Sequence, residues 1–324
     1  MDSISLIRTP IEAELRDFKE LFDSSLSSSN ALLDSVVSHI RQRNGKMMRP
    51  ILVLLVARLY GAVCPSTLHA AVSLELLHTA SLVHDDVVDE STERRGQLSV
   101  NAIFNNKVAV LTGDYLLATS LVHAELTNSH RIIQLVSTLG QDLADGELLQ
   151  LSNVSNHSFS EEVYFDVIRK KTAALFAACT KAAAFSVGVG EGEAELARLL
   201  GEYIGICFQI KDDIFDYFES KEICKPTGND MLECKLTLPA LYVLNTTNDA
   251  WAQEMALKVK DGTATVDEIA RLIEFIKQNG GIEYAIKVMY EYKERALDLL
   301  RMLPDSAVKT ALITYVDYVV DRDK

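Results

Sequence analysis

The chain has 324 residues, of which 48% are hydrophobic and 24% are charged, a balance that is typical of a folded protein with a large core and excludes a disordered chain. Its 15 glycines and 6 prolines are too few turn-forming residues for a β-sandwich or a β-barrel. Its net charge of -14 repels phosphate backbones, so nucleic acid is not an expected partner.

Apolar residues recur at helical spacing along most of the chain, and no sustained strand alternation interrupts them. The first two helical stripes run over residues 11–22 and 32–40. Four later segments are apolar on more than one face, which is typical of helices in the centre of a bundle. These segments are residues 66–90, 107–128, 159–189 and 192–219.

Two patterns mark the starts of helices. Ser158 with Glu161, and Thr265 with Glu268, have the spacing of a capping box, in which both side chains satisfy backbone N–H groups of the first turn. No linker rich in Ser, Gly or Pro divides the chain, so we expect one domain over residues 1–324. The sequence therefore predicts an all-α, single-domain helical bundle.

The sequence shows no signal for export or membrane insertion. The N-terminus lacks a basic start followed by an apolar core, which a secretory signal requires. The longest apolar runs are interrupted by Asp114 and Lys181, and fall short of the roughly 18 uninterrupted residues of a membrane span. Five cysteines without a CxxC pair fit a reducing compartment. We therefore expect a cytoplasmic protein without a transmembrane segment.

Two acidic motifs of the form DDxxD lie within apolar helical segments. Residues four apart on a helix share a face, so two carboxylates of each motif project side by side. Such oxygen pairs suit Mg²⁺, which completes its shell with water and substrate phosphates. One such motif alone is more often a solvated acidic turn, but two copies in apolar surroundings favour metal binding. The aspartates are Asp85, Asp86 and Asp89 in the first motif and Asp212, Asp213 and Asp216 in the second.

Basic residues gather near the loops beside these motifs. Salt bridges to the aspartates are one interpretation of the pair Arg94 and Arg95. In a chain this acidic, however, the whole group indicates a strongly anionic ligand, held by metal on one side and by Lys and Arg on the other. A diphosphate fits that description. The basic residues are Lys46, Arg49, Arg94, Arg95, Lys170, Lys171, Lys225 and Lys235.

Taken together, the motifs resemble those of the all-trans polyprenyl diphosphate synthase family, most closely the bacterial octaprenyl, or long-chain, type. The resemblance covers nearly the whole chain. It implies a helical bundle of the isoprenoid synthase type with a central cavity, the two acidic motifs facing each other across the cavity mouth, and a homodimer. The motifs, in the family's order, are GKxxRP at 45–50, DDxxD followed by RRG at 85–96, KTA at 171–173 and FQxxDDxxD at 208–216.

The resemblance also implies the activity and its metal. Family members elongate an allylic diphosphate, here expected to be farnesyl diphosphate, with successive isopentenyl diphosphate units. The six aspartates form a carboxylate clamp in which Asp85, Asp89 and Asp212 bind Mg²⁺ directly, with three ions present when substrate is bound. Thr172 and Gln209 lie near the allylic carbon and steady its positive charge. Released pyrophosphate is the expected base.

The basic residues divide between the two diphosphates by the same resemblance. A lone histidine on an apolar helix is usually a core residue, but His78 lies two helical turns before Asp85 on the same face, which favours ligand binding. The predicted contacts to the allylic diphosphate are Arg94, Lys171, Lys225 and Lys235. The predicted contacts to isopentenyl diphosphate are Lys46, Arg49, His78 and Arg95.

Product length depends on the residues just before the first aspartate. In the family, aromatic side chains four and five residues before it stop the growing chain early. Here these positions hold Ser81 and Ala80, which leave the tunnel open and argue against a farnesyl or geranylgeranyl product. The resemblance alone implies an octaprenyl product, used for the side chain of a quinone. Core packing is the more common explanation for leucines deeper in these helices, but some are candidates for a deeper floor of the tunnel. They are Leu74, Leu77, Leu116, Leu117 and Leu121.

Two alternatives remain open at this point. A class I terpene cyclase shares the helical fold and one DDxxD, but normally lacks the second copy. A non-catalytic subunit of a heteromeric prenyl synthase shares the packing, but such subunits usually lose aspartates or basic partners. Peripheral contact with a membrane during product release is also left open.

Overall fold

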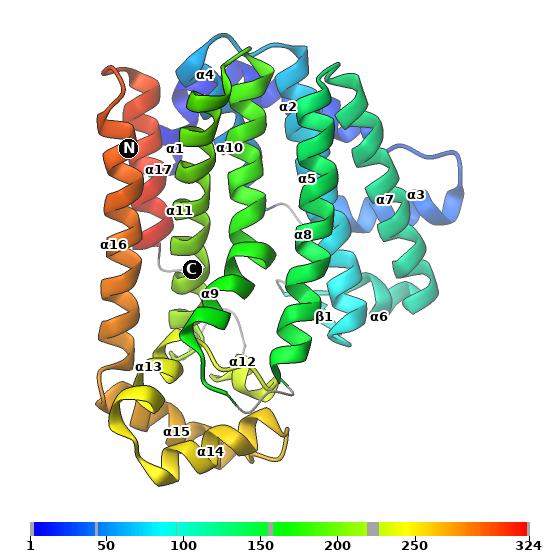
Figure 1. Cartoon of the computed structure of the whole chain (residues 1–324). Helices are drawn as coiled ribbons and strands as arrows, with labels where there is room; N and C mark the ends of the chain where they lie inside the picture. The colour runs from blue at the N-terminus through cyan, green and yellow to red at the C-terminus, as the bar shows by residue number, and fades with distance from the viewer. Residues whose placement is uncertain (1–2, 43–44, 95, 155–157, 219–226, 323–324) are drawn as a thin grey trace. The chain divides into compact units, whose positions relative to one another are not determined.

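The computed structural model describes residues 3–42, 45–94, 96–154, 158–218 and 227–322, and nearly all of this part of the chain is helical (Figure 1). The predicted all-α fold is confirmed. None of the described helices is long and apolar enough to cross a bilayer. The elements in chain order are α1 (Ser3–Arg8), the 3₁₀ turn η1 (Thr9–Ile11), α2 (Glu12–Ser25), α3 (Ala31–Arg41), α4 (Met48–Tyr60), α5 (Pro65–Val88), β1 (Glu93–Arg94), β2 (Gln97–Leu98), α6 (Val100–Phe104), α7 (Asn106–Leu126), α8 (His130–Val154), α9 (Glu161–Ile168), the π-helical turn η2 (Arg169–Ala173), α10 (Ala174–Ser186), α11 (Glu191–Phe215), α12 (Asn229–Leu232), α13 (Leu238–Thr247), α14 (Ala250–Lys260), α15 (Val266–Gln278), α16 (Gly281–Arg301) and α17 (Ala307–Asp321).

The chain divides into two compact units, and several helices contribute to both. The one-domain organisation over residues 1–324 therefore stays a prediction. The first unit comprises Met1–Gln141, Leu175–Gly201 and Leu299–Tyr315. The second comprises Asp142–Ala174, Glu202–Asp298 and Val316–Lys324.

The core of the first unit is built around α4, α5 and α7. Helix α5 packs along α7, and the two are joined at a buried point where Ser120 Oγ donates a hydrogen bond to the carbonyl oxygen of Ser73 at 2.8 Å. Residues 51–57 of α4 are all buried. Helix α5 buries residues on several faces, as the sequence predicts for a helix in the centre of a bundle. The same prediction for residues 107–128 is wrong, because α7 leaves an apolar face exposed at Leu111 and Val122.

A glycine allows α10 and α11 to approach closely in the first unit. A Cβ at Gly201 would overlap the hydroxyl of Thr180 and the backbone oxygen of Phe176, which cannot rotate away. Gly201→Ala is therefore expected to lower the free energy of unfolding by roughly 1–3 kcal/mol. Gly192 lies on the same helix with nothing within 4 Å of a Cβ, so Gly192→Ala is the matched control.

Urea unfolding of both variants measures the difference. Gly192→Ala is expected to leave the stability unchanged or raise it by up to about 1 kcal/mol, because alanine is the better helix former. Equal stabilities of the two variants would contradict the close approach of α10 and α11.

The second unit is held together partly by a tyrosine pair. The rings of Tyr242 on α13 and Tyr284 on α16 stack with their centroids 4.0 Å apart. The Tyr284 hydroxyl also donates a hydrogen bond to Glu161 Oε1 at 2.7 Å, at the start of α9. These contacts tie three helices of the unit together.

One of the two predicted capping boxes is confirmed and the other is wrong. At α15, Thr265 Oγ1 accepts from the Glu268 backbone N–H, and Glu268 accepts from the Thr265 N–H at 2.9 Å. At α9 the N-cap is Ser160, whose hydroxyl accepts from the backbone N–H of Val163. Ser158 lies before the helix, and its carbonyl oxygen accepts from Lys260 Nζ at 2.8 Å.

Candidate active site

The first acidic motif lies at the C-terminal end of α5. Asp85 is half-buried, Asp86 is fully buried, and Asp89 is exposed just after the helix. Asp86 Oδ1 accepts a hydrogen bond from Arg94 Nε at 2.5 Å. The carboxylate of Asp86 is therefore turned inward to an arginine, while Asp85 and Asp89 are the more accessible pair.

A short hairpin carries Arg94 to this position. Strands β1 and β2 pair antiparallel, with Glu93 opposite Leu98 and Arg94 opposite Gln97. Sequence analysis did not predict it, because two-residue strands give no alternation pattern. The neighbouring Arg95, a predicted contact to isopentenyl diphosphate, lies outside the described residues. The hairpin thus provides the partner of Asp86.

The loop before α4 and the first turn of that helix hold two of the predicted basic residues. Lys46 is exposed, and its carbonyl oxygen accepts a hydrogen bond from Arg8 Nη2 at 3.0 Å. The next residue, Met47, has a left-handed backbone with φ 52°. The guanidinium of Arg49 lies over the ring of Phe176, 4.9 Å from its centroid. The N-terminal helix thus holds the backbone that presents Lys46.

His78 is half-buried on α5, and its carbonyl oxygen accepts from Ser81 Oγ at 2.9 Å. It lies two helical turns before Asp85, as the sequence requires. The structure therefore places His78, Asp85, Arg49 and Lys46 in the first unit. Their contacts to a diphosphate stay predictions.

In the second acidic motif, each aspartate contacts a different set of protein groups. Both oxygens of Asp216 accept backbone N–H groups at the start of α12, from Asn229 at 3.0 Å and from Asp230 at 3.1 Å. Asp216 therefore fixes the backbone that follows residues 219–226, which are not described and include the predicted ligand Lys225. This use of Asp216 is structural.

Asp212 contacts an arginine from the end of the chain. Arg322 Nη2 lies 2.5 Å from Asp212 Oδ1 and donates to the carbonyl oxygen of Phe208 at 3.1 Å. The guanidinium also lies 4.0 Å from the centroid of the Phe208 ring. Only 11% of the Arg322 side chain is exposed. The C-terminal segment is thus anchored on the aspartate that was predicted to bind Mg²⁺.

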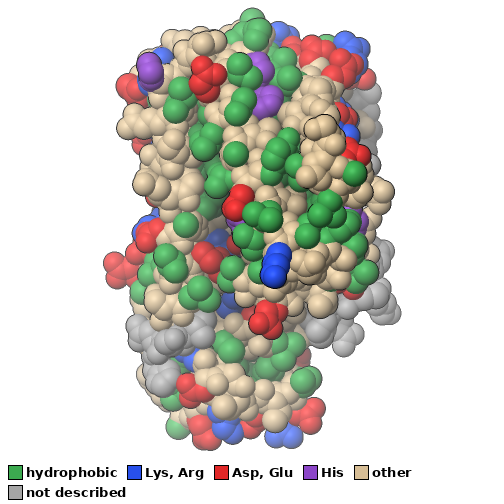
Figure 2. All heavy atoms as spheres, turned by 90° about the vertical axis from the view of Figure 1, so that its right-hand side faces the viewer, with side chains coloured by type: hydrophobic (Ala, Val, Ile, Leu, Met, Phe, Trp, Pro, Cys, Tyr) green, Lys and Arg blue, Asp and Glu red, His purple; other side chains and the backbone are tan. Residues whose placement is uncertain are grey.

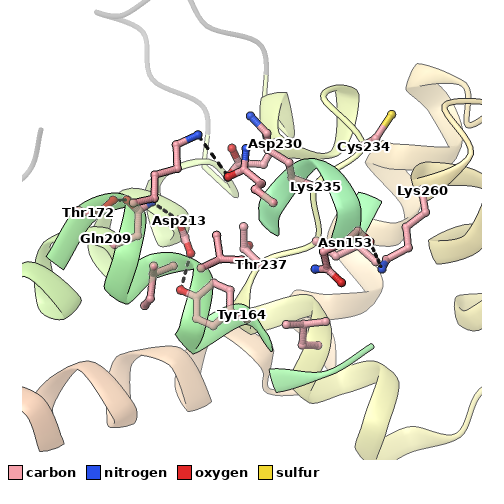
Figure 3. Close-up of a pocket in the computed structure, with 16 residues that line it drawn as sticks. Asn153, Tyr164, Thr172, Gln209, Asp213, Asp230, Cys234, Lys235, Thr237 and Lys260 are labelled. Atoms are coloured by element: carbon pink, nitrogen blue, oxygen red, sulfur yellow. Dashed lines mark hydrogen bonds between the residues drawn. The ribbon is translucent and has the colours of Figure 1, made fainter. Parts of the chain in front are cut away.

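Asp213 is the centre of a chain of hydrogen bonds (Figure 3). Its Oδ2 accepts from the hydroxyl of Tyr164 at 2.6 Å, and its Oδ1 accepts from Gln209 Nε2 at 2.7 Å. The carbonyl oxygen of Gln209 accepts from Thr172 Oγ1 at 2.6 Å. Burial raises the pKa of Asp213 to about 7, with Asp212 and Asp216 adding to the rise and the two hydrogen bonds opposing it.

The π-helical turn between α9 and α10 carries the predicted KTA motif. Lys171 Nζ pairs with Glu147 Oε2 at 2.5 Å and donates to Gln150 Oε1 at 3.3 Å. Lys170 pairs with Asp145 on the same helix, α8. Single π turns in helices are often found at functional sites. The acidic partners on α8 were not predicted, because no spacing rule connects them to the turn.

A cavity of about 180 Å³ opens among these side chains in the second unit (Figure 3). It brings together five of the predicted site residues, which come from three separate stretches of the chain. The lining includes the predicted residues Lys171, Thr172, Gln209, Asp213 and Lys235. It also includes Tyr164, Asp230 and Lys260, which sequence analysis missed.

Two of the missed residues are ionisable groups, Asp230, which is half-buried, and Lys260, which is 6% exposed. Burial, followed by the charges of Asp213 and Asp216, raises the pKa of Asp230 well above its ordinary value. Burial lowers the pKa of Lys260, whose ammonium donates to the carbonyl oxygens of Asn153 and Ser158. No sequence motif marks either residue, so only the fold reveals them.

The aspartates fit the kind of metal that the sequence predicts. Among the described residues, no group of three or more His, Cys, Asp or Glu side chains is placed to hold an ion by itself. Mg²⁺ does not need such a cage, because it usually takes one or two carboxylates and completes its shell with water and substrate phosphates. Asp85 with Asp89, and Asp212, are carboxylates of this kind near the protein surface.

Comparison with known proteins agrees with this fold. The family model "Polyprenyl synthetase" matches residues 30–276. Octaprenyl diphosphate synthase of Haemophilus influenzae is 32% identical, over 99% of this chain and 98% of the relative. A crystal structure described as geranylgeranyl pyrophosphate synthase from Bacteroides thetaiotaomicron is 73% identical, covers 99% of this chain and 100% of its own, and has a TM-score of 0.89.

A further solved structure bears on the metal. Polyprenyl synthase from Caulobacter crescentus, in complex with calcium and isoprenyl diphosphate, is 31% identical, with a TM-score of 0.93 and coverage of 99% of this chain and 98% of its own. The fold is that of the isoprenoid synthases, and the enzyme is a prenyltransferase. The chain belongs to the polyprenyl synthetase family and is a trans-prenyl diphosphate synthase.

Proposed function

We propose that the enzyme elongates farnesyl diphosphate with successive isopentenyl diphosphate units to an octaprenyl-type diphosphate for a quinone side chain. The observation that supports the long product is the pair of small side chains at Ala80 and Ser81 on α5. Ala80 is 2% exposed and Ser81 is half-buried, and neither position carries the aromatic ring that stops the growing chain in the family.

The proposed chemistry breaks the allylic carbon–oxygen bond, and the diphosphate leaves with the electron pair. The double bond of isopentenyl diphosphate then forms the new carbon–carbon bond, and the released pyrophosphate takes the proton that is lost. Asp85, Asp89 and Asp212 would hold Mg²⁺, three ions in all, whose charge stabilises the leaving group. Lysines and arginines of the site bind the diphosphates and orient them.

The other residues of the cavity would act on the organic part of the substrate. Thr172 and Gln209 line the cavity in the second unit, and both carry oxygens that can stabilise positive charge. Asp86 binds Arg94, and Asp216 binds the start of α12. These two aspartates would therefore position the surrounding protein groups and would not bind Mg²⁺ directly. That the two acidic motifs face each other across one mouth is part of this proposal.

Geranylgeranyl diphosphate is the second candidate product. The 73% identity to a chain described as a geranylgeranyl pyrophosphate synthase supports it. Incubation of the purified protein with Mg²⁺, farnesyl diphosphate and isopentenyl diphosphate, followed by mass spectrometry, separates the two. A ladder that ends at the octaprenyl length supports the long-chain proposal, and one added unit supports the shorter one. Absence of elongation with every primer would overturn both.

We also propose that the enzyme is a homodimer joined through α7. Leu111 and Val122 lie eleven residues apart, hence on one face, and are 68% and 57% exposed. Figure 2 shows hydrophobic side chains gathered on the side of the molecule where α7 runs in Figure 1. Apolar patches of this kind mark protein contacts. A second copy of the chain is the partner we propose.

The double variant Leu111→Lys, Val122→Lys is expected to convert the dimer to a monomer, because buried lysines at the contact would lose their hydration. Sedimentation velocity measures the mass. Met302→Lys, at a side chain that is 70% exposed elsewhere, is the matched control and should stay dimeric. A dimeric double variant would show that α7 is not the interface. The cytoplasmic location, with peripheral membrane contact at product release, stays a prediction.

A further inference from the structure

The hydrogen-bond chain through Asp213 has a defined direction. The amide of Gln209 turns its NH₂ group to Asp213 and donates to Oδ1. The amide oxygen therefore points the other way, and Thr172 donates its hydroxyl hydrogen to it. At the other end, Tyr164 donates to the second oxygen of Asp213. Every donor and acceptor in the chain is thereby fixed (Figure 3).

This direction determines which atoms are electron-rich at the cavity. Because the Thr172 hydrogen is used on Gln209, the hydroxyl oxygen keeps its lone pairs for the cavity that both side chains line. The carboxyl group of Asp213, which is 3% exposed, holds the amide of Gln209 in this orientation. Oxygens oriented in advance stabilise a developing positive charge without reorganising.

Tyr164 restrains the buried end of the chain. It is 6% exposed on α9, and its hydroxyl holds Asp213 Oδ2 in the position where Oδ1 meets Gln209. Without that hydroxyl, the carboxylate has a buried oxygen to satisfy and must turn to find another donor. A turn of Asp213 would release the amide of Gln209, and with it the orientation of Thr172.

We infer that Tyr164 is a positioning residue for prenyl transfer, which acts through Asp213 and Gln209 to direct the Thr172 oxygen at the allylic carbon. The inference rests on the proposed function, because it needs positive charge to develop at that carbon. Tyr164 makes none of the predicted contacts to a diphosphate. Its loss is therefore expected to change the rate of the chemical step and to leave substrate binding intact.

Tyr164→Phe is expected to lower kcat for the first condensation about tenfold, with KM for both substrates within about twofold of wild type. Tyr284→Phe is the matched control, because it removes a tyrosine hydroxyl that donates to a carboxylate at 2.7 Å in the same unit. The control should keep the wild-type kcat. Thermal unfolding of both variants confirms that each is folded under assay conditions.

A double-mutant cycle separates positioning from a general structural effect. In the Thr172→Val variant the series of hydrogen bonds has lost its last hydroxyl, so adding Tyr164→Phe is expected to lower kcat by less than about twofold. If the two substitutions lower kcat by the product of their separate effects, the inference is overturned. An unchanged kcat in Tyr164→Phe, or a change in KM alone, would also overturn it. Failure of the proposed function is distinct, because the wild-type enzyme itself would then not elongate a primer.

Discussion

Asp85→Ala and Asp212→Ala are each expected to lower Mg²⁺-dependent turnover about a thousandfold while leaving the fold intact. Each change removes a carboxylate that we propose to hold Mg²⁺ against the leaving diphosphate. Asp85 is half-buried at the end of α5, and the side chain of Asp212 is 41% exposed, so neither truncation opens a core cavity. Steady-state rates measure the loss, and circular dichroism checks the fold.

A binding measurement tests the proposed Mg²⁺ ligands without depending on turnover. Mg²⁺ with inorganic pyrophosphate should raise the unfolding temperature of the wild-type enzyme, because a ligand that binds only the folded state stabilises it. The shift should be smaller in both variants. Asp17→Ala, at a side chain that is 53% exposed and paired with Arg16, is the control and should behave as wild type. Wild-type rates in either variant would refute the metal assignment.

Ser81→Phe is expected to shorten the product to the farnesyl or geranylgeranyl length. By family resemblance an aromatic ring at this position blocks the tunnel below the reacting carbon. Ser81 is half-buried and its hydroxyl bonds only to its own helix, at the carbonyl oxygen of His78, so the change leaves no distant group unsatisfied. From farnesyl diphosphate the variant should add at most one isopentenyl unit, measured by mass spectrometry.

Ala80→Phe is a poorer test of the tunnel than Ser81→Phe. Ala80 is 2% exposed, so a phenylalanine there would overpack the core at a cost of roughly 1–3 kcal/mol. Ser81→Ala is the control for loss of the hydroxyl and should give the wild-type product. If Ser81→Phe and Ser81→Ala give the same products, the tunnel does not pass this face of α5.

The helices and the motifs on them were predictable because their signals are local. Apolar periodicity places a helix over 107–128, and the structure has α7 at Asn106–Leu126. The pairing of Asp86 with Arg94 is also nearly local, since eight residues separate the two. Local spacing could not choose between Ser158 and Ser160 as the cap of α9, because both are good N-cap residues.

The individual tasks of the aspartates were not predictable, because their partners lie far away in the chain. Arg322 is 110 residues from Asp212, and Tyr164 is 49 residues from Asp213. The spacing of FQxxDDxxD does not distinguish the six carboxylate oxygens of the motif, and only the family resemblance selects Asp212 as a direct ligand. Only the fold shows that all three aspartates have protein partners: Asp212 pairs with Arg322, Asp213 accepts from Tyr164 and Gln209, and Asp216 accepts from the start of α12.

The π-helical turn η2 brings the side chains of Tyr164 and Thr172 to the same side of their helical segment, so that both contact α11. On an α-helix each residue advances about 100°, so Thr172, eight positions after Tyr164, would be rotated roughly 80° away from it. Each step of a π turn advances only about 80°, and the four steps from Ile168 to Thr172 reduce the difference to about 10° or less. Thr172 and Tyr164 can then both reach residues four apart on α11, Gln209 and Asp213. With one residue fewer between them, Tyr164 and Thr172 would be seven α-helical positions apart and again within about 20° of one face, so the π turn accommodates one extra residue without changing the face that the two share.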